Sequence, residues 1–217
     1  MQKSAMLAES PFQFSSLIPP ATDRAVLVGQ TGSGKTTLAR YLLNERTLRG
    51  SHTVVFDYKG RIDWKEFELC TSLSKLAGSK KQSLLYRPTY EESQDEETVN
   101  KVWEWLYRRG GTTAYIDELD AISSGEVYPY YYGACLVRGR ELGIEVWSAT
   151  QRPTKIPQRT LSESENVYAF KLRLPQDRER VEALTGIDRT RINELRKREF
   201  LFSRQDGETQ GPIILKI

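Results

Sequence analysis

The sequence has little of several residue types, and each shortage argues against a class of protein. It contains one histidine and two cysteines, Cys70 and Cys135, which lie far apart without a CxxC pair. The sequence therefore indicates neither a disulfide framework nor a zinc site. It also lacks a signal-peptide pattern and any run of about 18 apolar residues. We therefore expect a protein that is neither secreted nor embedded in a membrane and that acts in the cytoplasm.

The balance of charge is too mild to identify a partner by itself. The net charge is +3, whereas proteins that bind nucleic acids usually show a stronger or clustered basic balance. The hydrophobic fraction of 38% is low beside a charged fraction of 28%, which fits a folded protein with extensive polar or interfacial surface. The positions of the charges must therefore carry any argument about nucleic acid.

The length of 217 residues suffices for one α/β domain with its own core, without room for a second full domain. Within residues 1–23, the segment from Ser10 onward is rich in serine and proline, with Phe12, Leu17 and Ile18 among the apolar residues between them. This composition predicts an N-terminal arm laid on a surface, which either covers a ligand or reaches a neighbouring subunit. We expect a single domain at 24–217, with a core at 24–153 and C-terminal strands and helices at 154–217.

Segments typical of strands and helices alternate along the chain. Short apolar runs predict strands at 24–28, 53–56, 67–71, 83–86, 112–117, 144–150 and 168–172, followed by two β segments after residue 198. Helical spacing predicts helices at 36–46, 91–109 and 130–142, and one or two short helices within 178–198. This alternation favours an α/β fold with a mostly parallel sheet and helices on both faces.

The segment GQTGSGKT, residues 29–36, lies between the first expected strand and the first expected helix. It matches the phosphate-binding pattern GxxxxGK[ST] in full, which occurs by chance in roughly one chain in a hundred of this length. Glycines let the backbone approach a phosphate, and N–H groups at a helix N-terminus attract negative charge. We therefore expect a P-loop that binds ATP through Gly29, Gln30, Thr31, Gly32, Ser33, Gly34, Lys35, Thr36 and Thr37.

The chemistry of the side chains predicts their roles. Lys35 is expected to reach the β- and γ-phosphate oxygens, and the Thr36 hydroxyl to bind Mg²⁺. In YIDE, residues 115–118, Asp117 is expected to hold Mg²⁺ through a water, while Glu118 orients and deprotonates the attacking water. These residues predict a P-loop nucleoside triphosphatase. The sequence has neither an NKxD-type guanine motif nor an LSGGQ-like signature, which argues against GTPases and ABC transporter ATPases.

Four segments together resemble the FtsK/HerA superfamily of DNA-pumping ATPases: GQTGSGKT, FDYKG at 56–60, YIDE, and RGRELGIEVWSATQRP at 138–153. Small viral genome-packaging ATPases, from phages or archaeal viruses, are most similar in size. The resemblance implies a RecA-like core in a homo-oligomeric ring, a pentamer or hexamer, around double-stranded DNA, with a capsid or portal protein as a further partner and no membrane. In FDYKG the sequence departs from better-known translocases, which often have a proline after the aspartate, and the roles of Asp57 and Lys59 stay open.

The resemblance also implies roles for residues around the strand expected at 144–150. Gln151 would be the polar sensor that contacts the γ-phosphate, and the alternative is a loop glutamine bonded to backbone. Arg138 or Arg140 would be the arginine finger that reaches the nucleotide of the adjacent subunit. Either arginine fits this role. The alternative for each is a solvent-exposed charge on a helix with no role at the nucleotide.

A pump that grips DNA without reading its sequence needs cations on loops. Two basic loops meet this condition, with the residues Arg152, Lys155 and Arg159 in one and Lys80 and Lys81 in the other. The tyrosine-rich segment 128–133 either faces a pore or a neighbour, or packs in the core. The basic segment 188–198 is more typical of a solvated helix face.

The leading hypothesis is ATP-driven translocation of double-stranded DNA by a ring that fills a viral capsid, in the host cytoplasm or at a virion vertex. One alternative is another pump of the same superfamily, acting in repair or conjugation. A second is a small P-loop kinase, which would need a lid and a cavity for its acceptor. A third is an assembly factor switched by nucleotide without catalysis.

Overall fold

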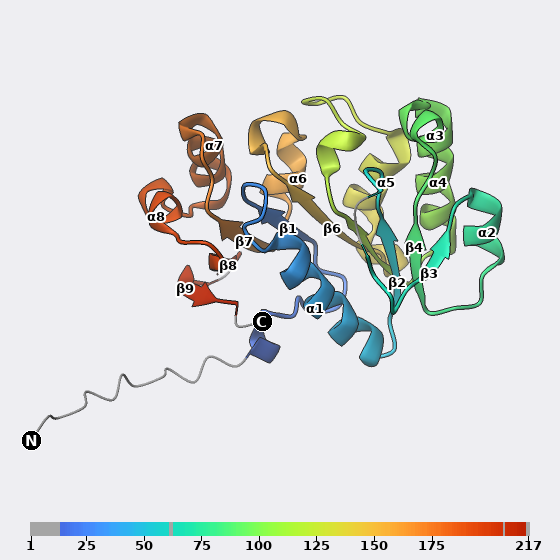
Figure 1. Ribbon diagram of the computed structural model, residues 1–217, viewed down its shortest axis with the longest axis horizontal. Helices are drawn as coiled ribbons and strands as arrows, with labels where there is room; N and C mark the ends of the chain where they lie inside the picture. Colours follow the sequence, from blue (N-terminus) through green and yellow to red (C-terminus); the bar gives the residue numbers. More distant parts are fainter. Residues whose placement is uncertain (1–13, 61–62, 206, 216–217) are drawn as a thin grey trace, which may run out of the picture.

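The computed structural model describes residues 14–60, 63–205 and 207–215. They form a nine-stranded sheet in the order β3-β4-β2-β5-β6-β1-β7-β8-β9. Strands β1 to β7 run parallel, and β8 and β9 extend one edge as antiparallel strands (Figure 1). The predicted α/β class with a mostly parallel sheet is thereby confirmed.

The elements follow the alternation expected from the sequence. The strands are β1 Ala25–Val28, β2 His52–Phe56, β3 Glu68–Cys70, β4 Ser83–Tyr86, β5 Thr112–Ile116, β6 Glu145–Thr150, β7 Asn166–Phe170, β8 Glu199–Arg204 and β9 Gln210–Ile214. The α-helices are α1 Lys35–Leu48, α2 Leu73–Gly78, α3 Tyr90–Gln94, α4 Glu96–Arg109, α5 Tyr130–Arg138, α6 Gln158–Ser162, α7 Pro175–Thr185 and α8 Arg189–Glu194. Short 3-10 turns lie at Phe14–Leu17, Leu119–Ala121, Arg140–Leu142 and Pro153–Lys155.

The helices differ from the expected pattern in three places. The helix expected at 91–109 is divided into α3 and α4, because Asp95 is extended and its carboxylate accepts a hydrogen bond from the Thr98 amide at 2.9 Å. The helix expected at 130–142 ends at Arg138, and the chain continues as a 3-10 turn up to the left-handed Gly143. The short helices α2 and α6 carry too few apolar positions to be recognised by periodicity.

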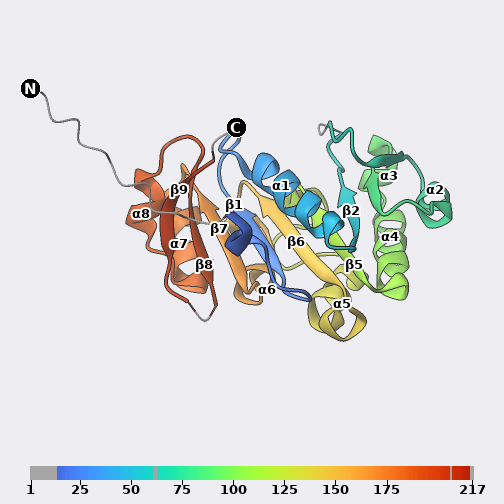
Figure 2. The ribbon, with the colours of Figure 1, turned by 90° about the horizontal axis from the view of Figure 1, so that it is seen from below.

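Each face of the sheet has its own apolar cluster, because successive side chains of a strand point to opposite sides. Leu27 of β1 belongs to the cluster under α1, whereas Val26 belongs to the cluster under α4 and α5. Figure 2 shows α1 on one side of the sheet and α5, α6 and α7 on the other. The central strands are therefore buried on both faces: every residue of β1, β5 and β6 is buried, although β5 and β6 also contain polar residues.

The end of the expected N-terminal arm packs against the domain. Leu17 and Ile18 are buried in the cluster on the α1 face, and the Leu17 carbonyl accepts a hydrogen bond from the Tyr168 hydroxyl. Residues 1–13, including Phe12, lie outside the described residues. In the part of the chain that the structure describes, no helix is long and apolar enough to cross a membrane.

The parallel strands bring the P-loop and the expected residues that follow β5 and β6 to one edge of the sheet. β6 lies between β1 and β5, with Val28 opposite Thr150 and Ile116 opposite Ser148. The segments that follow these strands therefore emerge side by side at their carboxyl ends. This edge is where ligands bind in open α/β sheets.

Candidate active site

The P-loop follows β1 directly, and two of its glycines have backbone angles that other residues rarely adopt. Gly32 and Gly34 have φ values of 70° and 117°. At Gly29 a Cβ atom would lie 2.5 Å from the Phe170 Cβ, so β7 packs directly against the loop. The loop leads into α1 at Lys35, and its N–H groups and the helix N-terminus together favour an anion.

Lys35 is buried at the start of α1 and extends along the loop. Its ammonium group donates hydrogen bonds to the Gly29 and Gln30 carbonyl oxygens at 2.7 and 3.2 Å. Burial lowers the pKa of Lys35, while the negative charges of Glu118 and Asp117 act in the opposite direction. Phosphate oxygens are stronger partners for an ammonium group than neutral carbonyls are, so Lys35 is well placed to bind them.

Asp117 is held in place by two hydroxyl groups. Its Oδ1 accepts hydrogen bonds from Thr36 at 2.9 Å and from the buried Tyr115 at 2.7 Å. Burial is the largest cause that raises the pKa of Tyr115 well above its usual value, so this hydroxyl stays protonated and donates. The Thr36 hydroxyl and the Asp117 carboxylate offer hard oxygen ligands, which fit Mg²⁺.

A magnesium ion at this position would take its other ligands from water and phosphate. Among the described residues, no group of three or more His, Cys, Asp or Glu side chains could hold a metal ion by itself. One carboxylate and one hydroxyl suit Mg²⁺ bound together with a nucleotide, because this ion keeps several waters and binds phosphate oxygens.

Glu118 lies at the centre of a polar cluster. Its carboxylate accepts a hydrogen bond from the Gln151 amide and lies 3.3 Å from the Lys59 ammonium group. Gln151 also accepts a hydrogen bond from the Thr31 hydroxyl, and Lys59 lies 3.7 Å from the Asp120 carboxylate. Burial raises the pKa of Glu118, which brings this carboxylate closer to the range of an efficient general base.

Tyr115 and Lys59 belong to this site, and the sequence did not identify a role for either. Tyr115 lies in an apolar strand and is indistinguishable there from a core residue. Lys59 follows the carboxyl end of β2, and only the pairing of β2 with β5 brings it beside Glu118. Asp57 has a different role, because it is buried and forms an ion pair with Arg87 at 2.8 Å.

The two arginines considered as fingers lie at the opposite edge of the sheet, near the amino end of β6. Arg138 ends α5 and is exposed, and a hydrogen bond with Tyr107 raises its pKa. Arg140 is 61% exposed and lies 2.9 Å from the Glu165 carboxylate. Neither side chain is placed to reach the P-loop of its own chain.

The basic residues expected to contact DNA lie at two opposite edges of the sheet. The loop 152–159 leaves the carboxyl end of β6, whereas the loop 78–81 precedes the amino end of β4. In the first loop, Arg152 donates a hydrogen bond to the buried Asp177 carboxylate at 3.0 Å, while Lys155 and Arg159 are exposed. The structure therefore does not bring the two basic loops together.

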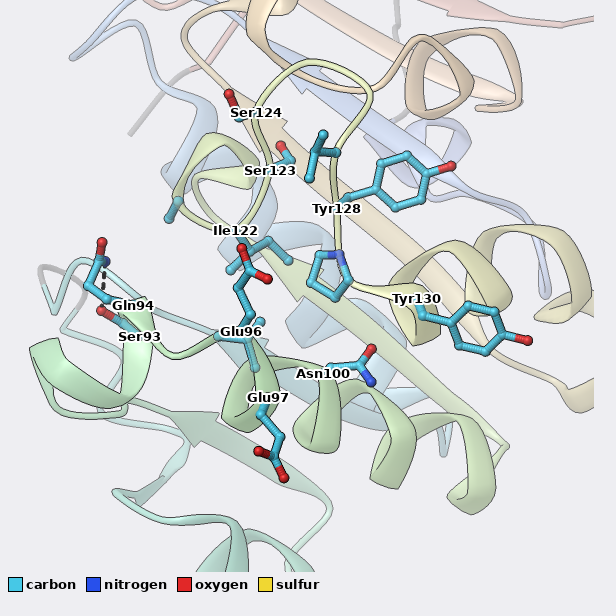
Figure 3. Close-up of a pocket in the computed structure, with 14 residues that line it drawn as sticks. Ser93, Gln94, Glu96, Glu97, Asn100, Ile122, Ser123, Ser124, Tyr128 and Tyr130 are labelled. Atoms are coloured by element: carbon cyan, nitrogen blue, oxygen red, sulfur yellow. Dashed lines mark hydrogen bonds between the residues drawn. The ribbon is translucent and has the colours of Figure 1, made fainter.

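A groove of about 540 Å³ lies beside the site, between α3 and α4 and the segment 121–130 (Figure 3). Glu96 and Glu97 of α4 line one part of it, and Tyr128 and Tyr130 line another. Of the described residues that line it, none belongs to the P-loop or to the carboxylates and glutamine beside it. In the described part of the chain, the groove therefore shares no lining residue with the phosphate site.

The chain resembles known proteins in its sequence. A family model described as an AAA domain matches residues 23–131, half of the chain, including the P-loop and both carboxylates after β5. The chain belongs to the AAA domain family. This AAA domain protein is 25% identical over 171 residues to the DNA packaging ATPase of Enterobacteria phage PRD1, in a match that covers 79% of this chain and 74% of that relative.

Solved structures share the fold of this AAA domain protein. The genome packaging NTPase of Sulfolobus turreted icosahedral virus 2 matches with a TM-score of 0.75 and 20% identity, over 90% of this chain and 99% of that chain. VirB4 of Thermoanaerobacter pseudethanolicus matches with a TM-score of 0.62 and 11% identity, over 85% and 87% of the two chains. The predicted resemblance to small viral packaging ATPases is confirmed by the phage relative together with the shared fold.

Proposed function

We propose that this AAA domain protein is an ATP-driven translocase of double-stranded DNA that packages a viral genome as a subunit of a homo-oligomeric ring. The observation that carries this proposal is the group of residues at the carboxyl edge of the sheet: the P-loop, the Thr36–Asp117 pair, and Glu118 with Gln151. The names of two relatives, a DNA packaging ATPase and a genome packaging NTPase, support the choice of DNA as the partner.

ATP is the proposed substrate, bound with its phosphates along the P-loop. Backbone N–H groups and Lys35 would bind the phosphate oxygens, while Thr36, and Asp117 through a water, would hold Mg²⁺. When bound, the ion supplies positive charge that stabilises the oxygens of the reacting phosphate. Solved complexes of the Sulfolobus virus NTPase with AMPPCP and ATP-gammaS support an adenine nucleotide as the ligand.

Glu118 is the proposed general base for hydrolysis. Its carboxylate would take a proton from the attacking water, and its raised pKa suits this role. Gln151 bonds to Glu118 and to Thr31 of the P-loop, so it links the base to the phosphate-binding loop. This position fits a residue that senses the γ-phosphate.

The arginine that completes the site is proposed to come from the adjacent subunit. Arg138 is the better candidate, since Arg140 already contacts the carboxylates of Glu165 and Asp23. Exposed Lys155 and Arg159 are the proposed contacts to DNA phosphates, while the contact with Asp177 gives Arg152 a structural role as well. Such a ring would act in the host cytoplasm or at a virion vertex, together with a capsid or portal protein.

The test is steady-state ATP hydrolysis measured against protein concentration, with and without double-stranded DNA. The rate per subunit should rise with both, fall about 10²-fold or more in Glu118→Gln, and fall about 10³-fold in Arg138→Ala. Arg109→Ala, at the exposed end of α4, should behave as the unmodified protein does. A rate indifferent to concentration and DNA would contradict the ring motor, and undiminished hydrolysis in Glu118→Gln would show that Glu118 is not the general base.

A further inference from the structure

Arg198, between α8 and β8, has a left-handed backbone that is rare for a residue with a side chain. Its φ is +69°, and among the described residues only Thr22 shares a positive φ without being glycine. Such conformations persist where the surroundings fix them, and they concentrate at ligand sites. The residues that hold the Arg198 backbone in this conformation therefore indicate which site the residue belongs to.

The backbone of Arg198 is hydrogen-bonded to the P-loop. Its N–H group donates a hydrogen bond to the Ser33 carbonyl at 3.1 Å, and its carbonyl accepts one from the Leu215 amide at 3.0 Å. A Cβ atom built on Gly34 would lie 3.8 Å from the Arg198 Cα. The residue is exposed, and within the described residues its guanidinium has no hydrogen-bond or ion-pair partner. A rigid backbone thus presents an uncommitted cation beside the phosphate-binding loop.

The order of the strands indicates which part of a nucleotide Arg198 would meet. The carboxylates and Gln151 follow β5 and β6, on one side of β1, whereas Arg198 precedes β8, on the other side of β1 beyond β7. The reacting γ-phosphate must face Glu118. Because the triphosphate is a linear chain, its nucleoside end leaves the P-loop toward β7 and β8.

We propose that Arg198 binds the nucleoside moiety of ATP, with its guanidinium stacked on the face of the purine. This inference rests on the proposed function, since it assumes that the P-loop binds ATP. A planar guanidinium stacks well on aromatic faces, which a lysine ammonium group does less well. The hydrogen bond to Ser33 holds this stacking group in a fixed relation to the phosphates.

The test compares the binding of ATP with that of inorganic tripolyphosphate, which lacks a nucleoside, by titration calorimetry. Arg198→Gly removes the side chain while keeping a residue that adopts the same backbone conformation. It should weaken ATP binding about threefold to thirtyfold, leave tripolyphosphate binding unchanged, and preserve the melting temperature. Arg198→Lys should recover only part of the loss, and Arg196→Ala, at an exposed arginine nearby, should bind both ligands normally.

Lys35→Ala separates a failure of this inference from a failure of the proposed function. If Lys35→Ala weakens both ligands while Arg198→Gly weakens neither, the nucleoside role of Arg198 is wrong and the nucleotide site stands. If Arg198→Gly lost affinity for ATP and for tripolyphosphate equally, Arg198 would be a phosphate ligand and the inference would be overturned. If the unmodified protein binds neither ligand, the proposed function and this inference both fail.

Discussion

At the scale of single residues, the acidic pair after β5 shows how similar groups acquire different tasks. Asp117 is fixed by two hydroxyl donors, which suits a residue that positions a metal-bound water. Glu118 instead contacts the Gln151 amide and the Lys59 cation and has a raised pKa, which suits a residue that receives a proton. The Asp117 and Glu118 carboxylates should therefore respond differently when a hydrogen-bond or ion-pair partner is removed.

Tyr115→Phe should lower the rate of ATP hydrolysis about tenfold, because Asp117 loses a charge-assisted hydrogen bond that orients it. The matched control is Tyr132→Phe, on the other face of the sheet, where a buried hydroxyl bonds to Thr160 at 2.9 Å. Both variants should lower the melting temperature, but only Tyr115→Phe should lower kcat. Equal kcat values for the two variants would show that Tyr115 contributes only to stability.

At the scale of elements, α7 fixes the loop that begins with Gln151. Asp177 in the first turn of α7 is 1% exposed, and its carboxylate accepts hydrogen bonds from Arg152 at 3.0 Å and from the Thr154 amide and hydroxyl at 3.1 and 2.7 Å. Since these donors come one and three residues after Gln151, we infer that Asp177 helps to position the glutamine.

Asp177→Asn should destabilise the protein by about 1–3 kcal/mol, because an amide cannot accept all of these hydrogen bonds. It should also lower kcat, by misplacing Gln151, more than it changes the affinity for ATP. The control is Asp188→Asn at the exposed N-terminus of α8, where asparagine caps a helix equally well. Calorimetric melting and steady-state kinetics measure both effects, and a normal kcat in Asp177→Asn would contradict the positioning role.

The sequence predicts those elements and site residues whose signals are local. Apolar runs locate the central strands, and GxxxxGK[ST] locates the P-loop, because each pattern is contained within a few neighbouring residues. Lys59 and Arg198 could not be assigned, since their positions depend on β2 pairing with β5 and on β8 extending the sheet beyond β7. The break at Asp95 is not evident from apolar periodicity, although aspartate favours an N-cap over a helix interior, because the helical spacing of 91–109 runs through it.

At the scale of the whole molecule, an ionic cluster joins segments that are distant in sequence. Arg24 ahead of β1 lies 2.6 Å from the Glu165 carboxylate ahead of β7, and Arg140 lies 2.9 Å from the same group. Burial tends to raise the pKa of Glu165, but hydrogen bonds from the Arg24 side chain and backbone outweigh it and lower the pKa overall. The charged carboxylate therefore stabilises the fold.

The stability that Glu165 contributes should disappear in acid. Because its pKa is lower in the folded state, the contribution is complete above the pKa of the unfolded chain, about 4.3, and is lost as pH falls through the folded value. At pH 7 the free energy of unfolding of Glu165→Gln should be lower than that of the unmodified protein by about 1–3 kcal/mol. Between pH 6 and pH 3 this variant should lose less of that free energy than the unmodified protein does. Urea unfolding across this range measures both effects, with Glu141→Gln at an exposed site as control. Parallel pH profiles for the unmodified protein and Glu165→Gln would contradict this account.

The place of β1 in the sheet has a consequence for how the chain folds as it is synthesised. The strand that leads into the P-loop pairs only with β6 and β7 among the described strands, and both are translated after the segment 23–131 that carries the family match. Within that segment alone, β1 has no partner strand. Residues 23–131 therefore carry the family's pattern without the strands that flank β1, and we expect a growing chain to order its phosphate-binding loop only after β7 has emerged.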